Sequence, residues 1–173
     1  EISECLVGSE MCIRDRLQIL ANKAGIYGMI GGQCADICAE ELPSDQVTKE
    51  LLWYIHKNKT AALIEAALMI GAVLAGAPDE AVKKLEQAAE NIGIAFQIQD
   101  DILDVTSSLE VLGKPVGSDE KNHKVTYVRL NGLEQSKKDV EALSEEALTI
   151  LSSFDRRNEF LEDLVRALIT REK

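Results

Sequence analysis

One long helical stripe, at residues 79–107, constrains the fold more than any other feature of the sequence. Apolar side chains recur along it at three- and four-residue steps, among them Leu85, Ile92 and Ile102. This spacing places them on one face of a helix. A helix with such a face must bury it against other elements, so the chain needs several further helices or a sheet as a partner.

The rest of the chain offers helices rather than strands. We predict helical spacing from Leu17 to Cys38, a helix with Thr48 as N-cap, an interruption at 56–60, an apolar helix at 60–76 and amphipathic helices at 133–152 and 156–171. Residues 124–130 have the composition of a strand, but no second strand could pair with them, so we predict a short helix there. The predicted fold class is therefore all-α.

Composition sets limits on the partners. The 173 residues are 46% hydrophobic, which is enough for one core and one domain. Asp and Glu number 30 against 19 Lys and Arg, a formal charge of −11. Such an acidic chain is not expected to bind nucleic acid or an anionic membrane. The longest uncharged run, 66–77, is too short to span a bilayer, so we predict a buried helix there.

The cysteines give an expectation about location. All four (Cys5, Cys12, Cys34 and Cys38) lie in the first quarter of the chain, without a CxxC pair. We interpret them as buried thiols rather than as a disulfide or metal site, and we expect a reducing, cytoplasmic environment. No targeting signal is predicted.

Residues 1–16 differ from the rest of the chain, because they do not share the apolar periodicity that starts near Leu17. We interpret 1–16 as a non-native junction segment. The predicted domain is then 17–173.

An acidic cluster lies in the middle of the long helix. Gln97, Asp100, Asp101 and Asp104 are separated by steps that place them on one face, far from either helix end. Two carboxylates about 4 Å apart repel by ~4 kcal/mol at an effective dielectric of 20. A bound cation would relieve this, and Mg²⁺ fits because it takes one or two carboxylates and completes its shell with water and phosphate oxygens. The alternative is a solvated acidic stripe. A calcium EF-hand loop and a di-iron bundle do not match the pattern.

Three lysines could complete a diphosphate site. Lys59 precedes Thr60 at the start of the apolar helix, while Lys114 and Lys124 flank a polar loop after the acidic cluster. Each alone would be a surface lysine. Together with a carboxylate-bound Mg²⁺, they could surround a diphosphate.

Five motifs in a fixed order resemble one family. They are Gly32-Gln33-x-x-Asp36, Lys59-Thr60, Phe96-Gln97-x-x-Asp100-Asp101-x-x-Asp104, Gly113-Lys114 with Asp119, and Lys124-x-Thr126. This set resembles the carboxyl-terminal part of the short-chain trans-isoprenyl diphosphate synthases, the farnesyl and geranylgeranyl diphosphate synthase family, over residues 17–173.

The resemblance implies a truncated isoprenoid-synthase-type helical bundle around a cavity, roughly its second half, usually in a homodimer. It implies a role for each matching residue. Mg²⁺ would be bound by Asp100, Asp101, Asp104 and Asp119; the diphosphate by Lys59, Gln97, Lys114 and Lys124; catalysis would involve Lys59, Thr60 and Gln97; and the cavity would be lined by Gln33, Asp36 and Phe96.

The implied reaction is Mg²⁺-dependent condensation of an allylic diphosphate, dimethylallyl or geranyl, with isopentenyl diphosphate to give farnesyl or geranylgeranyl diphosphate. The family also requires an earlier helix with a first aspartate-rich motif and an arginine pair, which this sequence lacks. We therefore expect the isolated chain to be inactive and to form a dimer or larger oligomer. The alternatives are a non-catalytic helical fragment that only self-associates and a one-motif enzyme similar to terpene cyclases.

Overall fold

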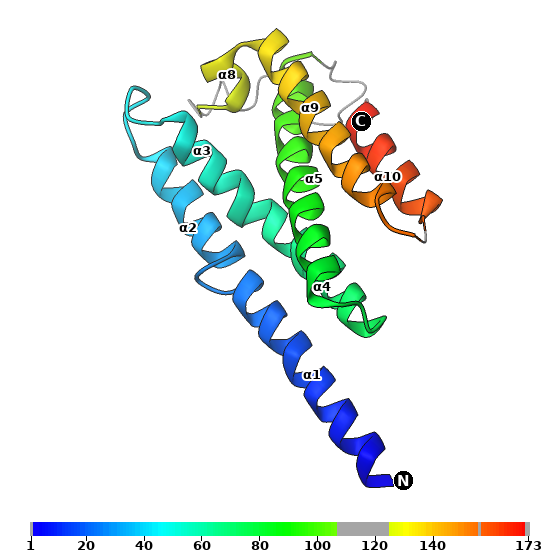
Figure 1. Ribbon diagram of the computed structural model, residues 1–173. Helices are drawn as coiled ribbons and strands as arrows, with labels where there is room; N and C mark the ends of the chain where they lie inside the picture. The colour runs from blue at the N-terminus through cyan, green and yellow to red at the C-terminus, as the bar shows by residue number, and fades with distance from the viewer. Residues whose placement is uncertain (1, 107–124, 156, 172–173) are drawn as a thin grey trace.

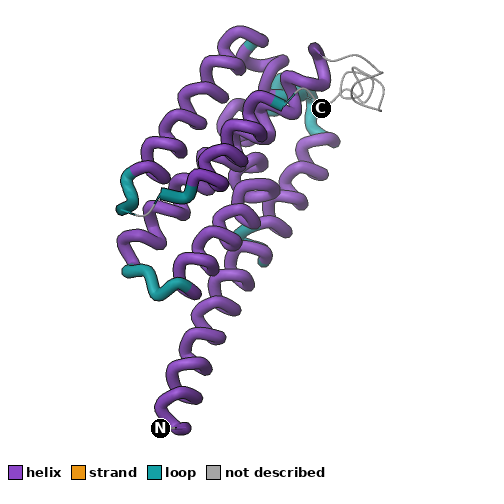
Figure 2. Tube along the Cα trace, turned by 90° about the vertical axis from the view of Figure 1, so that its right-hand side faces the viewer, coloured by secondary structure: helices purple, strands orange, loops and turns teal. Residues whose placement is uncertain are grey.

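The computed structural model describes residues 2–106, 125–155 and 157–171. Every regular element in these ranges is a helix, which confirms the all-α prediction. The elements are α1 (Ile2–Ala24), α2 (Met29–Glu40), α3 (Lys49–Ile55), the π-helix η1 (His56–Ala61), α4 (Ala62–Leu74), α5 (Asp79–Thr106), α8 (Tyr127–Asn131), α9 (Leu133–Ser152) and α10 (Glu159–Thr170). They form a bundle from which the amino-terminal part of α1 projects (Figures 1 and 2).

The long helix predicted at 79–107 is α5, and it is the centre of the bundle (Figure 1). It packs against η1, α4, α8, α9 and α10. Ile94, Ile98 and Ile102 form a buried stripe against Tyr127 of α8 and Val140 of α9. Full burial of one such side chain stabilises a fold by about 1.5–3 kcal/mol. Burial of this stripe therefore sets how α5 is rotated about its axis, and with it the direction in which the acidic cluster faces.

Four other predicted helices are confirmed. Thr48 caps α3, where its hydroxyl accepts a hydrogen bond from the Leu51 amide at 3.2 Å. Residues 127–131 form the short helix α8, capped by Thr126. The two final amphipathic helices are α9 and α10, and Asn158 caps the second. Capping side chains satisfy backbone amides that the helix itself leaves without partners.

The helical spacing predicted from Leu17 to Cys38 is divided between two helices in the structure. A turn at 25–28 separates α1 from α2, and the Gly28 amide donates to the Gly25 carbonyl at 3.0 Å. Glycine costs about 1 kcal/mol relative to alanine in a helix interior, which favours a break where two occur close together. α1 also begins at Ile2, so it includes most of the 1–16 segment.

The prediction of buried thiols is wrong for Cys34 and Cys38, which are both exposed. α2 packs through the opposite face, where Gly32 and Asp36 are buried. Each cysteine follows one of these residues by two positions, which is about 200° around a helix. Within the described ranges, no helix is long and apolar enough to cross a membrane.

An ion-pair cluster fastens α1 to the bundle. Lys23 of α1 pairs with Glu65 of α4, which is 2% exposed, and with Glu86 of α5 at 2.6 Å. Burial raises the pKa of the Glu65 carboxyl, and the hydrogen bond from Lys23 offsets this only in part. Burial opposes the charge on Lys23, but its bonds to the two carboxylates outweigh burial and raise its pKa. The contact between Lys23 and Glu65 is thus largely out of water.

Candidate functional site

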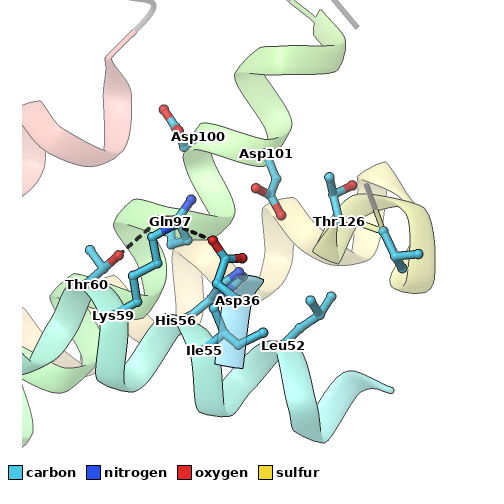
Figure 3. Close-up of a pocket in the computed structure, with 11 residues that line it drawn as sticks. Asp36, Leu52, Ile55, His56, Lys59, Thr60, Gln97, Asp100, Asp101 and Thr126 are labelled. Carbon is cyan, nitrogen blue, oxygen red and sulfur yellow. Dashed lines mark hydrogen bonds and ion pairs between the residues drawn. The ribbon is translucent and has the colours of Figure 1, made fainter. Parts of the chain in front are cut away.

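A cavity of about 250 Å³ lies where α2, η1 and α5 meet the residues that lead into α8 (Figure 3). Six residues that the sequence predicts for the site line it: Asp36, Lys59, Thr60, Gln97, Asp100 and Asp101. They come from three helices and from positions up to 65 residues apart along the chain. Leu52, Ile55 and Val125 give the cavity an apolar side. The cavity therefore combines charged groups, a hydroxyl and an amide with an apolar side.

Lys59 and Asp36 form the central charged pair of the cavity. The Lys59 ammonium lies 2.5 Å from Oδ2 of Asp36, whose side chain is 8% exposed. A partly buried pair of this kind is held firmly, because separating it would leave a carboxylate out of water. The pair fixes the Lys59 ammonium at the cavity, where it can meet an anion.

Thr60 and Gln97 form a second polar pair beside the first (Figure 3). The Thr60 hydroxyl donates to Oε1 of Gln97 at 3.0 Å, which joins η1 to α5. A hydroxyl and an amide held at fixed positions present dipoles without a net charge. Such fixed dipoles can stabilise a charged or strongly polarised ligand.

The π-helix explains how consecutive residues reach the cavity. His56, Lys59 and Thr60 all lie in η1 and all line the cavity. The interruption predicted at 56–60 is therefore a widened helical turn within a continuous helical segment from α3 to α4. Single π turns inside α-helices occur frequently at functional sites. Nothing in the residue spacing distinguishes such a turn from a loop, so the sequence could not predict it.

Two glycines allow neighbouring helices to approach η1 closely. A Cβ at Gly32 of α2 would lie 2.2 Å from the Lys59 backbone nitrogen. A Cβ at Gly93 of α5 would lie 2.4 Å from Cα of Ala61. Close helix packing therefore accounts for both glycines, and η1 is held between the two contacts.

Gly93→Ala is therefore expected to destabilise the protein, by about 1–3 kcal/mol, because the new methyl group overpacks against the backbone of η1. Gly71→Ala is the matched control: Gly71 lies in α4, and a Cβ there meets nothing within 4 Å. That change should stabilise by up to about 1 kcal/mol, because alanine is the better helix former. Urea unfolding measures both. Equal stability of the two variants would contradict the close contact.

The predicted acidic face divides in the structure. Asp101 is 8% exposed and accepts a hydrogen bond from the Tyr127 amide at 2.8 Å. The Asp100 side chain is 44% exposed, pairs with Arg171 at 3.1 Å and points away from Asp101 (Figure 3). Asp104 is 3% exposed and does not line the cavity. Interactions with two different parts of the chain thus hold the first two carboxylates apart.

Among the described residues, the cavity offers Mg²⁺ two carboxylates of α5, so a metal there needs further ligands. Across residues 2–106, 125–155 and 157–171, no group of three or more Cys, His, Asp or Glu side chains could hold a metal. Asp100 and Asp101 nevertheless line one cavity, and Mg²⁺ in phosphate sites takes only one or two carboxylates plus phosphate oxygens and water. The donor set therefore matches a metal that arrives with a diphosphate.

The remaining predicted residues lie elsewhere. Gln33 of α2 and Phe96 of α5 are half-buried and do not line the cavity. Phe96 instead lies under the Arg171 guanidinium, 3.8 Å from its ring centroid, because it is one residue, or about 100°, from Gln97 around α5. Lys114, Lys124 and Asp119 lie outside the described residues.

Tyr127 and His56 were not predicted for the site. Tyr127 is 1% exposed, its amide holds Asp101, and its hydroxyl donates to Asp139 at 2.7 Å. Burial, and then the bond to Asp139, raise the pKa of Tyr127, so its hydroxyl stays protonated. The His56 ring lies 6.2 Å from the Tyr127 ring and lines the cavity. The only sequence signal for His56 is its position one turn before Lys59.

Comparison with known families and proteins gives a consistent result. Residues 9–164 match the family described as polyprenyl synthetase. Geranylgeranyl pyrophosphate synthase 11, chloroplastic, from Arabidopsis thaliana is 45% identical over 154 residues, which are 89% of this chain and 43% of that protein. Dimethylallyltranstransferase from Fischerella ambigua is 42% identical over 152 residues, 88% of this chain and 43% of its own length. The chain thus spans less than half the length of these curated relatives.

Comparison with solved structures agrees with these family and sequence matches. The Helicobacter pylori geranyltransferase, complexed with magnesium and isoprenyl diphosphate, matches with a TM-score of 0.74 at 35% identity, over 92% of this chain and 51% of that one. The geranylgeranyl pyrophosphate synthetase from Pyrococcus horikoshii matches with a TM-score of 0.84 at 23% identity, over 94% of this chain and 60% of that one. The second comparison supports the fold alone.

Proposed function

The chain belongs to the polyprenyl synthetase family of prenyltransferases, and we propose that it forms the half of the active site that binds and ionises an allylic diphosphate. Its fold is part of the helical bundle of isoprenyl diphosphate synthases. One observation carries the proposal: Lys59, Thr60, Gln97, Asp100 and Asp101 line a single cavity. A cation, two polar groups and two carboxylates are what a diphosphate arriving with Mg²⁺ requires.

The proposed substrates are dimethylallyl or geranyl diphosphate and isopentenyl diphosphate. The carbon–oxygen bond of the allylic substrate breaks and releases diphosphate, the alkene of isopentenyl diphosphate forms the new carbon–carbon bond, and a proton is lost. Repetition of this step with further isopentenyl diphosphate would give farnesyl or geranylgeranyl diphosphate as the product. The names of the relatives, geranylgeranyl pyrophosphate synthase and dimethylallyltranstransferase, support this class of reaction.

Each residue has a role that its position supports. Lys59, held at the cavity by Asp36, would place its charge beside the leaving diphosphate. Thr60 and Gln97, joined at 3.0 Å, would present their dipoles to the developing allylic cation. Leu52 and Ile55 would keep water from that cation.

The residues around the diphosphate would also provide its metal site. Asp100 and Asp101 would hold Mg²⁺, and we retain Asp104 and Asp119 as proposed ligands, with Lys114 and Lys124 as diphosphate contacts. When bound, Mg²⁺ would supply positive charge that stabilises the leaving diphosphate. Gln33 and Phe96 remain proposed cavity residues of the complete bundle.

We expect Mg²⁺ and inorganic pyrophosphate to stabilise the chain together more than either does alone, because each supplies ligands that the other needs. Binding at 100 times the dissociation constant stabilises by about 2.7 kcal/mol, or roughly 5–10 °C in melting temperature for a domain of this size. Thermal shift with Mg²⁺ alone, pyrophosphate alone, both, and Mg²⁺ with inorganic phosphate is the measurement. An effect of pyrophosphate that does not depend on Mg²⁺ would contradict the assignment.

We propose that the isolated chain does not condense the two substrates, because it spans only 43% of its curated relatives. Incubation with Mg²⁺, labelled isopentenyl diphosphate and geranyl diphosphate tests this, and labelled product would refute it. A further proposal is that 1–16 is a junction segment and 17–173 the carboxyl-terminal part of the synthase domain. Sequencing the source locus tests that proposal, and finding 1–16 encoded contiguously there would refute it.

We also propose that the chain forms a homodimer or larger oligomer, because several large apolar side chains are exposed. Tyr27 is 84% exposed and Ile26 67%, and Leu63 of α4 is 42% exposed. Exposed apolar side chains of this size favour association with a second copy of the chain. We expect light scattering to give at least twice the mass of 19.0 kDa at micromolar concentration. A stable monomer that binds no hydrophobic dye would contradict this. Oligomers with no Mg²⁺-dependent pyrophosphate binding would favour the non-catalytic alternative.

A cytoplasmic location remains a proposal, although the exposed thiols of Cys34 and Cys38 no longer support it. The Arabidopsis relative is named chloroplastic. Imaging of the tagged protein in its source cells would decide between the two compartments.

A further inference from the structure

The last described residue, Arg171, is fastened to α5 beside the cavity. Its guanidinium lies 3.8 Å from the Phe96 ring centroid and donates to the Phe96 carbonyl at 3.3 Å. It also donates to Oδ1 of Asp100 at 3.1 Å, and the Gln99 amide donates to the Arg171 carbonyl at 3.5 Å. The Arg171 side chain is only 19% exposed. These contacts attach the end of α10 to the helix that carries the acidic cluster.

The geometry gives Arg171 a clear electrostatic effect. Asp100 is next to Asp101 in sequence, and both carboxylates line the same cavity. A guanidinium on Asp100 offsets the repulsion between these like charges when no metal is bound. A divalent cation at Asp100 would compete with the guanidinium for the same oxygen and would repel it.

The Arg171 guanidinium does not use all of its hydrogen-bond donors in this arrangement. Nε of Arg171 is buried and has no hydrogen-bond partner. A buried donor without a partner costs free energy, so this arrangement of the guanidinium is easier to exchange than a fully bonded one.

We infer that Arg171 is a counter-ion that holds Asp100 in the metal-free chain, and that a divalent cation displaces it and releases the end of α10 from α5. The inference rests on the proposed function, because it takes Asp100 as a metal ligand. It makes the carboxyl-terminal end of α10 responsive to metal at the active site.

The first test uses Mn²⁺ alone, titrated into the full chain and followed by the electron paramagnetic resonance signal of the free ion. Arg171→Gln should bind Mn²⁺ about three- to fivefold more tightly than the wild type, as expected when a competing partly exposed ion pair is lost. Arg166→Gln is the matched control, since it removes the same charge from α10 itself, and Arg166 lines a groove on the α9 side of α5. This variant should bind Mn²⁺ as the wild type does.

The second test needs no variant. Labelling with phenylglyoxal, read out by mass spectrometry, should show higher reactivity of Arg171 in saturating Mn²⁺ than without metal, while Arg166 does not change. The labelling therefore tests the inference even if Arg171→Gln fails to fold.

The outcomes separate the inference from the proposed function. A wild-type chain that binds Mn²⁺, with unchanged affinity in Arg171→Gln and unchanged labelling of Arg171, overturns the inference alone. Equal tightening by Arg171→Gln and Arg166→Gln also overturns it, because the effect would then be long-range charge rather than contact. A wild-type chain that binds no Mn²⁺, with or without pyrophosphate, overturns the proposed metal site itself.

Discussion

Lys23→Met should destabilise the protein by about 3–5 kcal/mol at neutral pH, because it leaves the Glu65 carboxylate buried without its cation. Glu65 is 2% exposed, and its Oε1 already has no hydrogen-bond partner. The variant cannot move this carboxylate into water without separating α1 from α4. Urea unfolding of the wild type and the variant measures the difference in unfolding free energy.

Two controls separate the buried charge from other effects of the substitution. Lys84→Met removes an exposed pair with Glu80 at 3.4 Å and should change stability by less than about 1 kcal/mol. Lys23→Met combined with Glu65→Gln should recover much of the loss, because no charge is then buried. If the two single variants are equally stable, the pair does not hold α1 to the bundle.

The stability lost in Lys23→Met should depend on pH, in a direction that follows from the pKa shifts of Lys23 and Glu65. The raised pKa of Lys23 means that its contribution in the wild type is complete below 10.5 and is lost as pH rises through the folded-state pKa. The raised pKa of Glu65 means that the folded chain holds its proton more tightly than the unfolded chain, whose value is near 4.5. Acidification from pH 7 towards 4.5 should therefore reduce the penalty in Lys23→Met, where no lysine opposes protonation of Glu65.

The sequence predicts the helices well where their apolar residues follow one strong period. α5, α9 and α10 agree with their predicted ranges because burial of a single face determines each of them. Reliance on the apolar period also explains the errors between Leu17 and Cys38, where the break in the helix and the exposed cysteines were not predicted. The period continues through the glycines, while the cost of glycine breaks the helix, and the cysteines lie on the face that α2 leaves exposed.

The candidate site was predicted in its parts but not in its arrangement. Asp36, Lys59, Gln97 and Asp100 were predicted from motifs, and the fold brings them to one cavity. The contacts between segments that are far apart in the chain could not be predicted from the sequence. The π turn of η1 and the pairing of Arg171 with Asp100 depend on how helices far apart in the chain pack together.

The most direct test of the proposed site is the affinity of Mg²⁺-pyrophosphate for Lys59→Gln, measured by calorimetry. Lys57→Gln is the matched control, because Lys57 lies in the same π-helix but pairs with Glu90 at 2.9 Å and does not line the cavity. Loss of a hydrogen bond to a charged group costs about 1.5–3 kcal/mol, which is roughly 10- to 100-fold in affinity. We predict that weakening for Lys59→Gln and a change of less than about twofold for Lys57→Gln, where only an exposed pair is lost. Equal affinity in the wild type and both variants would show that the cavity does not bind the diphosphate.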